Sequence, residues 1–396
     1  MQKFKGAVVV GAGPVGFLTA LGIARAGIDV MVVDAEAGIN DSPRAAVYFP
    51  TTLKILDRLG LKDDVEAVSY KSTTFSYRLV ATGEAVRVDT ASSFPPDSPY
   101  RYNAHFGQHI LAQIVARHLL RIPGAQVRWN TRVVGLSQSD SGVTLTVETP
   151  QGRDEILADW VVGADGARSG VRHLLGLPFE GHTWPERFVA TNLYYDFEKY
   201  GFEPANMLAD AVNWAVVARL GIEDMWRVTY AENADIDDAE AIRRIPQHYA
   251  AILPDPAARF EIIAASPYRV HERCAPTFRV GRVLLAGDAA HACNPCGGMG
   301  LTGGVIDANA LIDVLTAVIR GRARDSVLDF YSTERRRVFV EVTSPIATQY
   351  KQRMCEPDDA RRRADFEEFR RMAEAPEQSV MATQLSKMVE GQPMPV

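Results

Sequence analysis

Three motifs far apart in the chain carry glycine and aspartate at positions suited to binding a dinucleotide. They are Gly11-Ala12-Gly13-Pro14-Val15-Gly16, Asp165-Gly166-Ala167-Arg168-Ser169 and Gly287-Asp288-Ala289-Ala290-His291. The glycine-rich motif alone is a weak signal, because short glycine patterns are common. The three motifs in this order indicate one FAD held by segments distant in sequence, and so an oxidoreductase.

The first motif has the local context that dinucleotide binding requires. In this context Gly11 permits a tight turn, Gly13 lets the backbone approach a pyrophosphate, and Gly16 allows close packing of a helix on a strand. The apolar run 7–10 predicts a buried strand before it, and helical spacing of apolar residues over 15–26 predicts a helix after it. A helix that begins near Pro14 and Val15 offers free amides and a positive dipole end to phosphates.

A carboxylate for the ribose is expected at the end of the next strand. The run 30–33 predicts that strand, and Asp34 and Ala35 follow it directly. Asp34 lies 23 residues after Gly11, where an acidic side chain can bond both ribose hydroxyls. Glu36 competes for this role but lies past the strand end, so Asp34 is preferred.

Length and composition limit the classes of protein that the chain can be. Its 396 residues exceed what one hydrophobic core usually absorbs, so we expect two interlocked domains. The net charge of −6 argues against nucleic acid as the main partner. No apolar run approaches the roughly 20 residues of a membrane span. Four cysteines make no secreted disulfide framework in so long a chain, which favours a cytoplasmic protein.

The remaining pattern predicts an α/β protein with a separate β-rich region. The segments 75–80 and 85–88 flank a turn and predict a hairpin, and 127–149 predicts strands around a second hairpin turn. Gln108–Leu120 has helical spacing, and 180–268 is rich in strand-forming residues. From Met354 onward the chain is charge-rich and predicted to be helical, with a frayed end at 391–395.

The chain resembles the class A FAD-dependent aromatic hydroxylases, the family of p-hydroxybenzoate and salicylate hydroxylases. Besides the three motifs it carries Ser42-Pro43-Arg44-Ala45, Gln108 at the start of a helix, and Tyr331-Ser332-Thr333-Glu334-Arg335-Arg336. The resemblance covers residues 1 to about 345. It implies a Rossmann-type FAD-binding domain built from 1–71, 101–178 and 269–345, a β-sheet substrate domain from 72–100 and 179–268, and a C-terminal helical segment, 346–396.

The resemblance also implies roles for the matched positions. Arg44, Arg168 and Arg172 would meet phosphates or a visiting nicotinamide cofactor, Gln108 the ribityl chain or pyrophosphate, and Asp288 a ribityl hydroxyl. The loop from Pro295 and the helix after it would face the flavin ring, with Met299 where the family commonly has Gln. His291 is assigned to packing. The implied FAD contacts are Gly11, Gly13, Pro14, Val15, Gly16, Asp34, Ala35, Arg44, Gln108, Asp165, Gly166, Arg168, Asp288, Gly298, Met299, Gly300 and Leu301.

The implied reaction inserts one oxygen atom into an aromatic substrate, either a phenol or an aromatic acid. It proceeds through a flavin hydroperoxide and consumes O2 and NAD(P)H. The substrate would lie between the flavin and the second sheet. There Tyr194, Tyr195 or His182 could deprotonate a phenol, and Pro295 would lie at the reacting ring, although each aromatic is more often part of a core. No metal is expected, and a homodimer is left open.

The Cys293-Asn294-Pro295-Cys296 motif allows more than one interpretation. A Cys-x-x-Cys beside a flavin could relay electrons to thiols, which would make the protein a flavin-dependent dithiol oxidoreductase. The motif could also be half of a zinc site, but no second Cys/His pair follows at suitable spacing. The plainer interpretation is that two small side chains fill a crowded loop. A non-enzymatic flavin-binding protein is the other alternative.

Overall fold

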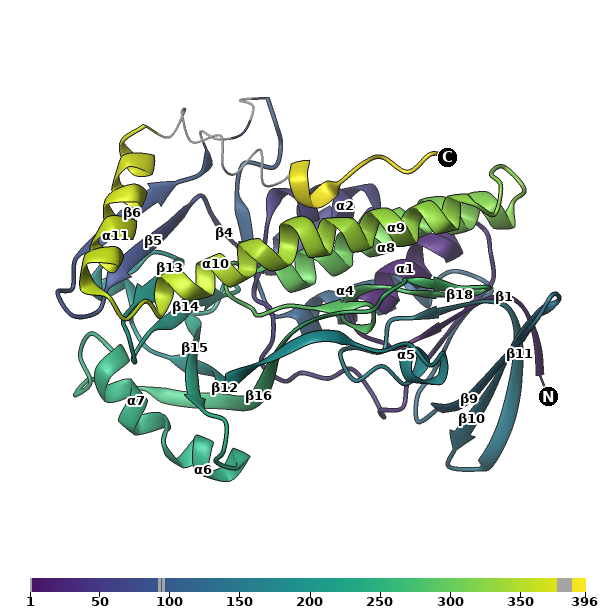
Figure 1. Ribbon diagram of the computed structural model, residues 1–396, viewed down its shortest axis with the longest axis horizontal. Helices are drawn as coiled ribbons and strands as arrows, with labels where there is room; N and C mark the ends of the chain where they lie inside the picture. The colour runs from purple at the N-terminus through teal and green to yellow at the C-terminus, as the bar shows by residue number, and fades with distance from the viewer. Residues whose placement is uncertain (1, 92–93, 95–96, 376–386) are drawn as a thin grey trace.

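The computed structural model describes residues 2–91, 94, 97–375 and 387–396, and it confirms the predicted α/β fold. Figure 1 shows an elongated molecule with a parallel sheet toward one end and a larger, mainly antiparallel sheet toward the other. Long helices run along the molecule and connect the two ends. The predicted division into domains is not tested by this arrangement and stays a prediction.

The first sheet is built on parallel strands. In spatial order these are β18 (Val283–Leu285), β11 (Gly152–Gly163), β1 (Gln2–Val10), β2 (Val30–Val33) and β8 (Ala125–Arg128). β2, β18 and the C-terminal parts of β1 and β11 are almost entirely aliphatic and buried, as expected for strands covered on both faces. The register pairs Val10 with both Val33 and Gly163, and Gly163 with Leu285. The carboxyl ends of four strands therefore lie at one edge.

Two hairpin strands and a short edge strand complete this sheet. They are β9 (Arg132–Ser139), β10 (Gly142–Thr149) and β17 (Arg279–Val280). β10 pairs antiparallel with both β9 and β11, which confirms the hairpin predicted over 127–149.

Helices cover the first sheet. α1 (Pro14–Arg25) buries the unbroken run 16–24 and packs between α4 (Gln108–Leu119) and α8 (Met299–Ile319), which agrees with the predicted helices. Among the described residues, α8 has the length and composition of a possible membrane span. Because 78% of its most apolar stretch is buried inside the protein, α8 is better explained as a core helix.

The second sheet has eight strands and also includes the predicted hairpin of residues 75–88. In order they are β19 (His291–Ala292), β16 (Glu261–Cys274), β12 (Glu180–Tyr194), β15 (Met225–Asn233), β14 (Ala215–Leu220), β13 (Ala205–Ala209), β5 (Thr74–Leu79) and β6 (Ala85–Asp89). A small third sheet consists of β3 (Val47–Tyr48), β7 (Asn103–His105) and β4 (Tyr70–Ser72), in that order. Its strands come just before β5 and just after β6 in the sequence.

The two faces of the second sheet pack against different partners. Leu193, Trp226 and Val228 share a core with α6 (Asp238–Arg243) and α7 (Ile245–Ile252). Side chains of opposite parity, such as Phe188 and Ala231, pack instead with Cys296 of the loop before α8. Because side chains alternate along a strand, this second face is the one turned toward the parallel sheet's loops.

The C-terminal segment is helical, as predicted, and its helices extend from the first sheet to the second. α9 (Val327–Val338) continues through a π-helical stretch, Phe339–Thr343, into α10 (Ser344–Met354), and α11 (Asp359–Glu374) lies on β5 and β6 (Figure 1). The expectation of a frayed end is wrong for Gln392, whose backbone N–H donates to the Glu334 carboxylate at 2.7 Å.

Candidate flavin site

The edge where the parallel strands end is closed by two loops in tight contact. Gly11 donates its N–H to the Val33 carbonyl, and the N–H of Ala164 donates to the Val10 carbonyl, both at 2.8 Å. Gly11 has φ +109°, and a Cβ there would lie 2.3 Å from the Ala164 carbonyl oxygen. Glycine is therefore required at this position, because the second motif packs directly on the first.

The other two glycines of the first motif have opposite surroundings. A Cβ at Gly16 would lie 2.0 Å from the Gly11 carbonyl oxygen, whereas a Cβ at Gly13 would meet no atom within 4 Å. Gly13 is the N-cap of α1, no side chain caps that helix, and Pro14 follows it. The space beside Gly13 thus faces free helix amides, which fits a pyrophosphate.

A cavity of about 80 Å³ opens beside this helix end. Its lining contains four of the predicted cofactor contacts, Gly13, Pro14, Asp34 and Gln108. The remaining lining residues are Ala12, Glu36, Gly38, Ile39, Asn40, His109 and Ala112. Open space at Gly13, an uncapped helix and a carboxylate in one cavity fit the adenosine diphosphate part of FAD.

Asp34 is held in place by the backbone. Its carboxylate accepts hydrogen bonds from the N–H of Ala12 at 2.6 Å and from the N–H of Glu36 at 2.8 Å. Glu36 lines the same cavity. The preference for Asp34 as the ribose ligand stays a prediction, since both carboxylates are within the cavity.

The second motif is organised by Asp165, which accepts hydrogen bonds from the Ser169 hydroxyl at 2.5 Å and the Val171 N–H at 3.1 Å. Ser169 in turn is the N-cap of the short helix α5 (Gly170–Leu174), where its hydroxyl accepts from the Arg172 N–H at 3.0 Å. Burial raises the pKa of the Asp165 carboxyl. Gly166 has φ +79°, and Arg168 is exposed at the tip of this loop.

Arg172, which the resemblance assigned to phosphates or a visiting nicotinamide cofactor, is buried between the second and third motifs. It is 7% exposed and donates to the carbonyls of Ala289 and Ala167 at 2.8 and 2.9 Å. Its guanidinium also lies 3.7 Å from the centroid of the Phe179 ring. Arg172 therefore fastens the second motif to the third.

The backbone and the histidine of the third motif are held by Asp307, a fully buried residue of α8. Its carboxylate accepts from the Gly287 N–H at 3.0 Å and from Arg335 Nε at 2.7 Å, and it bonds His291 Nε2 at 2.6 Å. His291 also stacks on Phe339, with ring centroids 4.5 Å apart. The packing role predicted for His291 agrees with these contacts.

Asp288 of the third motif lies in the short 3-10 turn that follows β18. It is exposed, yet surrounding atoms desolvate its carboxyl enough to raise its pKa, while His291 and Arg44 lower it. Arg44 is also exposed, and its guanidinium lies 4.9 Å from the centroid of the Tyr268 ring.

The loop before α8 lies in left-handed backbone conformations that suit only glycine. Gly297 and Gly298 have φ +86° and +69°, and a Cβ at Gly298 would lie 2.9 Å from the Phe49 ring. No side chain caps α8, so the backbone amides of its first turn, which begins with Met299 and Gly300, remain available to a ligand. Leu301 is half-buried, and Pro295 is exposed. An uncapped helix end of this kind fits the expected flavin ring.

Sequence reasoning missed the residue that anchors this loop. Buried Glu272 accepts from the side-chain and backbone N–H groups of Asn294 at 3.0 and 3.3 Å, and from the Ser344 hydroxyl at 2.9 Å. A single acidic side chain on β16 gave no signal of this, because its partners lie over 20 and 70 residues away.

Cys293 and Cys296 are not joined by a disulfide bond in the structure. Both are free thiols, and burial raises the pKa of both well above the usual range. Because the thiolate is the reactive form, these two side chains are poorly suited to dithiol exchange. Among the described residues no cluster of His, Cys, Asp and Glu could hold a metal ion.

The three predicted proton acceptors do not gather at the loop. Tyr195 packs in the core beneath α6 and α7 and donates its hydroxyl to the Asp255 carbonyl at 3.1 Å. Tyr194 is 39% exposed and contacts Glu223, and His182 is exposed beside Trp184. None of them contacts Arg44 or Pro295 in the described hydrogen bonds and ring contacts, and their roles in deprotonating a phenol stay predictions.

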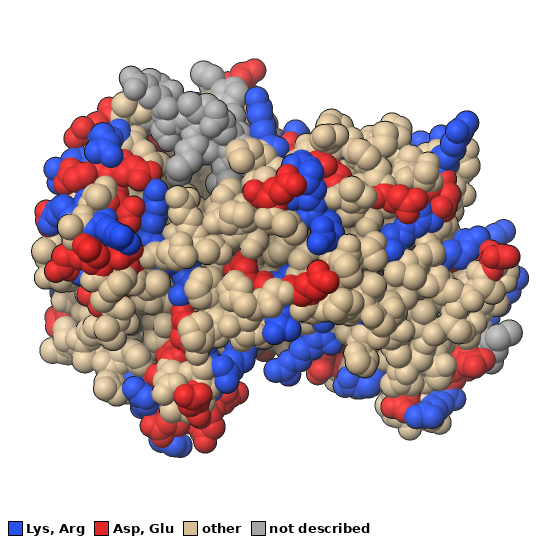
Figure 2. Space-filling model, viewed as in Figure 1, with Lys and Arg blue, Asp and Glu red and all other residues tan. Residues whose placement is uncertain are grey.

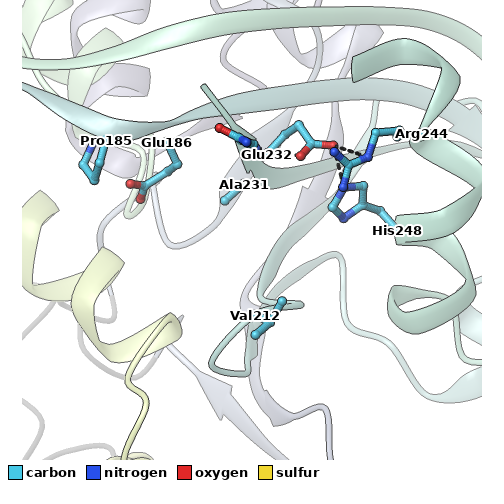
Figure 3. Close-up of a pocket in the computed structure, with 8 residues that line it drawn as sticks. Pro185, Glu186, Val212, Ala231, Glu232, Arg244 and His248 are labelled. Carbon is cyan, nitrogen blue, oxygen red and sulfur yellow. Dashed lines mark hydrogen bonds and ion pairs between the residues drawn. The ribbon is translucent and has the colours of Figure 1, made fainter. Parts of the chain in front are cut away.

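A cavity of about 380 Å³ lies elsewhere, at the end of the second sheet (Figure 3). Figure 3 shows Glu232 directed at Arg244 and His248, which lie 3.4 and 2.8 Å from its carboxylate. None of the three motifs contributes to the lining, and both of its carboxylates already have basic partners, Glu186 with Lys351 and Glu232 with Arg244 and His248. On the face in Figure 2, acidic and basic side chains are interspersed, without a patch of one sign.

A parallel sheet whose edge joins three such motifs defines an FAD-binding flavoprotein. The family described as FAD binding domain matches residues 6–344, and the chain belongs to this family. It is a class A FAD-dependent aromatic monooxygenase. The para-nitrophenol 4-monooxygenase of Pseudomonas sp. strain WBC-3 is 45% identical over 372 residues, which cover 93% of this chain and 92% of that protein.

Two further relatives support this assignment. The 6-hydroxy-3-succinoylpyridine 3-monooxygenase HspB of Pseudomonas putida strain DSM 28022 / S16 is 42% identical over 345 residues, 86% of each chain. The crystal structure of p-nitrophenol 4-monooxygenase PnpA from Pseudomonas putida DLL-E4 has a TM-score of 0.94 at 43% identity, covering 99% of this chain and 100% of that one. Neither the dithiol nor the non-enzymatic alternative is supported.

Proposed function

We propose that this monooxygenase uses NAD(P)H to hydroxylate a phenolic ring at the carbon para to its hydroxyl. The observation that carries the proposal is the position named for both relatives. In para-nitrophenol 4-monooxygenase, carbon 4 bears the nitro group, para to the hydroxyl. In 6-hydroxy-3-succinoylpyridine 3-monooxygenase, carbon 3 bears the succinoyl group and is likewise para to the hydroxyl.

The residues of this chain supply position and charge for that reaction. FAD, when bound, supplies the electron transfer from NAD(P)H and the activation of O2. Asp34 and the α1 amides would hold its adenosine diphosphate part, Asp288 its ribityl chain, and the uncapped start of α8 would favour negative charge on its ring. Exposed Arg44 and Arg168 offer cationic groups for the phosphates of a visiting NAD(P)H.

With 4-nitrophenol the proposal fixes the stoichiometry. Insertion of oxygen at carbon 4 expels the nitro group as nitrite and leaves a quinone. One 4-nitrophenol, one O2, one NAD(P)H and one proton give one 1,4-benzoquinone, one nitrous acid, one water and one NAD(P)⁺. The two electrons from NAD(P)H reduce the second oxygen atom to water.

The test is a screen of NAD(P)H oxidation with 4-nitrophenol, 3-nitrophenol, a 6-hydroxypyridine with a 3-acyl group and a phenol without a para substituent, with product masses measured. We expect nitrite from 4-nitrophenol and none from 3-nitrophenol, whose nitro group is not para. Oxygen insertion only beside the hydroxyl would contradict para attack. NAD(P)H oxidation that no phenol stimulates would contradict the proposed substrate class.

A further inference from the structure

Arg227 of β15 is a buried cation without an anionic partner. It is 6% exposed, and its Nε and one Nη donate to the neutral Asn192 amide oxygen at 3.0 and 2.8 Å. Its other Nη is buried with no hydrogen-bond partner. Burial lowers the pKa of this guanidinium to about 10. Leaving a desolvated charge unpaired is costly, so such a group is expected where an anion binds.

Other buried arginines of the same sheet are paired with acids. Arg187 forms an ion pair with Asp238, and Arg219 forms ion pairs with Glu198 and Asp224. Among the described residues no carboxylate lies within ion-pair distance of Arg227. The missing anion is therefore specific to Arg227 and not a property of the sheet.

A second unpartnered polar group lies in the same neighbourhood. The Tyr48 hydroxyl is buried without a hydrogen-bond partner, while its ring stacks on Phe106 at 4.0 Å between centroids. The charge of Arg227 acts on Tyr48, which places the two groups near each other. Phe49, the next residue, touches the Gly298 position of the loop assigned to the flavin ring.

The groups that hydrogen-bond with Arg227 or interact with it electrostatically come from five parts of the chain, and none of them is acidic. They are Asn192 of β12, Tyr48 of β3, Tyr268 of β16, His109 of α4 and Arg44 in the loop before β3. Tyr268 is partly exposed and lies under the exposed Arg44, so solvent reaches this group of residues. The region is aromatic, positive and accessible.

We propose that the free Nη of Arg227 and the hydroxyl of Tyr48 bind the phenolate oxygen of the substrate, so that the ring enters as an anion. The aromatic side chains around them would pack on the ring. A guanidinium and a phenol hydroxyl both donate hydrogen bonds, and two donors to one oxygen favour its ionised form. Phenolate in turn enriches the para carbon in electrons, which suits attack by an electrophilic oxygen. The inference deepens the proposed function and rests on it.

The first test uses the wild-type holoenzyme without NAD(P)H, so that no turnover occurs. 4-Nitrophenol is a direct probe, because its phenolate is yellow and its phenol form is not. Absorbance titrations across pH should show the bound ligand ionising about one to two pH units below the free ligand, which corresponds to a 10- to 100-fold preference for phenolate. Ionisation at or above the pH of the free ligand would overturn the proposal.

Variants assign the effect to residues. Arg227→Gln should abolish the shift and weaken 4-nitrophenolate binding roughly 10- to 100-fold, and Tyr48→Phe should weaken it roughly 2- to 10-fold. Binding of 4-nitrotoluene, which has no ionisable oxygen, should change little in either variant. The matched control is Arg219→Gln, a buried arginine of the same sheet, which should leave the shift intact. A shift that persists in Arg227→Gln overturns the assignment.

Two further outcomes are separated by design. If Arg227→Gln does not fold, the wild-type titration and Tyr48→Phe, whose ring stack is preserved, decide the matter. Normal nitrite release by a folded Arg227→Gln variant with wild-type affinity overturns the inference and leaves the proposed function standing. A downward shift that Arg227→Gln abolishes, in an enzyme that hydroxylates no phenol, overturns the function and leaves the anion site standing.

Discussion

The two glycines at 13 and 16 should respond to alanine in opposite ways. At Gly16 the added methyl would lie 2.0 Å from the Gly11 carbonyl oxygen, a backbone atom that cannot move without separating α1 from β1. We therefore expect Gly16→Ala to destabilise the protein even without FAD, by about 2–4 kcal/mol in the free energy of unfolding, as overpacked core positions do.

Gly13→Ala should leave the fold almost unchanged. Gly13 has φ −77°, which alanine adopts readily, and no atom lies within 4 Å of the new methyl. The methyl instead occupies the space beside the α1 amides where a pyrophosphate would approach. Loss of charge-assisted hydrogen bonds there should cost about 1.5–3 kcal/mol of binding free energy, which raises the Kd for FAD roughly 10- to 150-fold.

The assay separates stability from binding. Thermal unfolding of the FAD-free proteins measures the first, and quenching of FAD fluorescence on titration measures the second. The reasoning is refuted if Gly13→Ala binds FAD as tightly as the wild type, because the open space would then not be the pyrophosphate site. It is also refuted if apo Gly16→Ala unfolds at the wild-type temperature.

Three other changes test the site from different sides. Replacing Cys293 and Cys296 together with Ser should leave turnover within about tenfold, a barrier change below about 1.4 kcal/mol, and loss of several orders of magnitude would restore the dithiol alternative. Arg172→Met should remove two hydrogen bonds between the second and third motifs, lower the free energy of unfolding by about 2–3 kcal/mol and speed FAD loss on dialysis; unchanged unfolding and retention would contradict this role. Burial would raise the pKa of Asp307, but His291 and Arg335 outweigh it and lower that pKa from 3.8 to about 2. The stabilisation is therefore complete above about pH 4 and is lost as pH falls toward 2, on the order of 2 kcal/mol, and urea unfolding of Asp307→Asn should lack this part of the acid dependence.

Much of the parallel sheet could be predicted because its signals are local. An apolar run that ends in glycine, a helix of regular spacing and a second apolar run fix β1, α1 and β2 without distant information. The same holds for the hairpin β9–β10. The sequence resemblance then located the cofactor loops, although the individual FAD contacts remain predictions.

Side-chain facing in the second sheet could not be predicted in this way. Alternation shows that Tyr194 and Tyr195 lie on opposite faces, but not which face meets the loop before α8. Only the packing of α6 and α7 settles that Tyr195 lies away from it. Arg227 had a usable signal, a lone cation within the apolar stretch 225–230, but its unpaired state depends on residues brought together from five parts of the chain.

The strand order of the parallel sheet also constrains how the chain can fold during synthesis. β1 has β11 as a neighbour, and β11 in turn has β18, so adjacent strands are separated by more than 100 residues of chain. Pairings of such high sequence separation form slowly, because a long loop must close before any contact rewards it. The first motif leaves the ribosome early, yet its binding surface is complete only after Asp288 and α8 have been made. β1 keeps one unpaired edge until β11 has been made, and the nascent chain has no complete FAD site to stabilise it until α8 has been made.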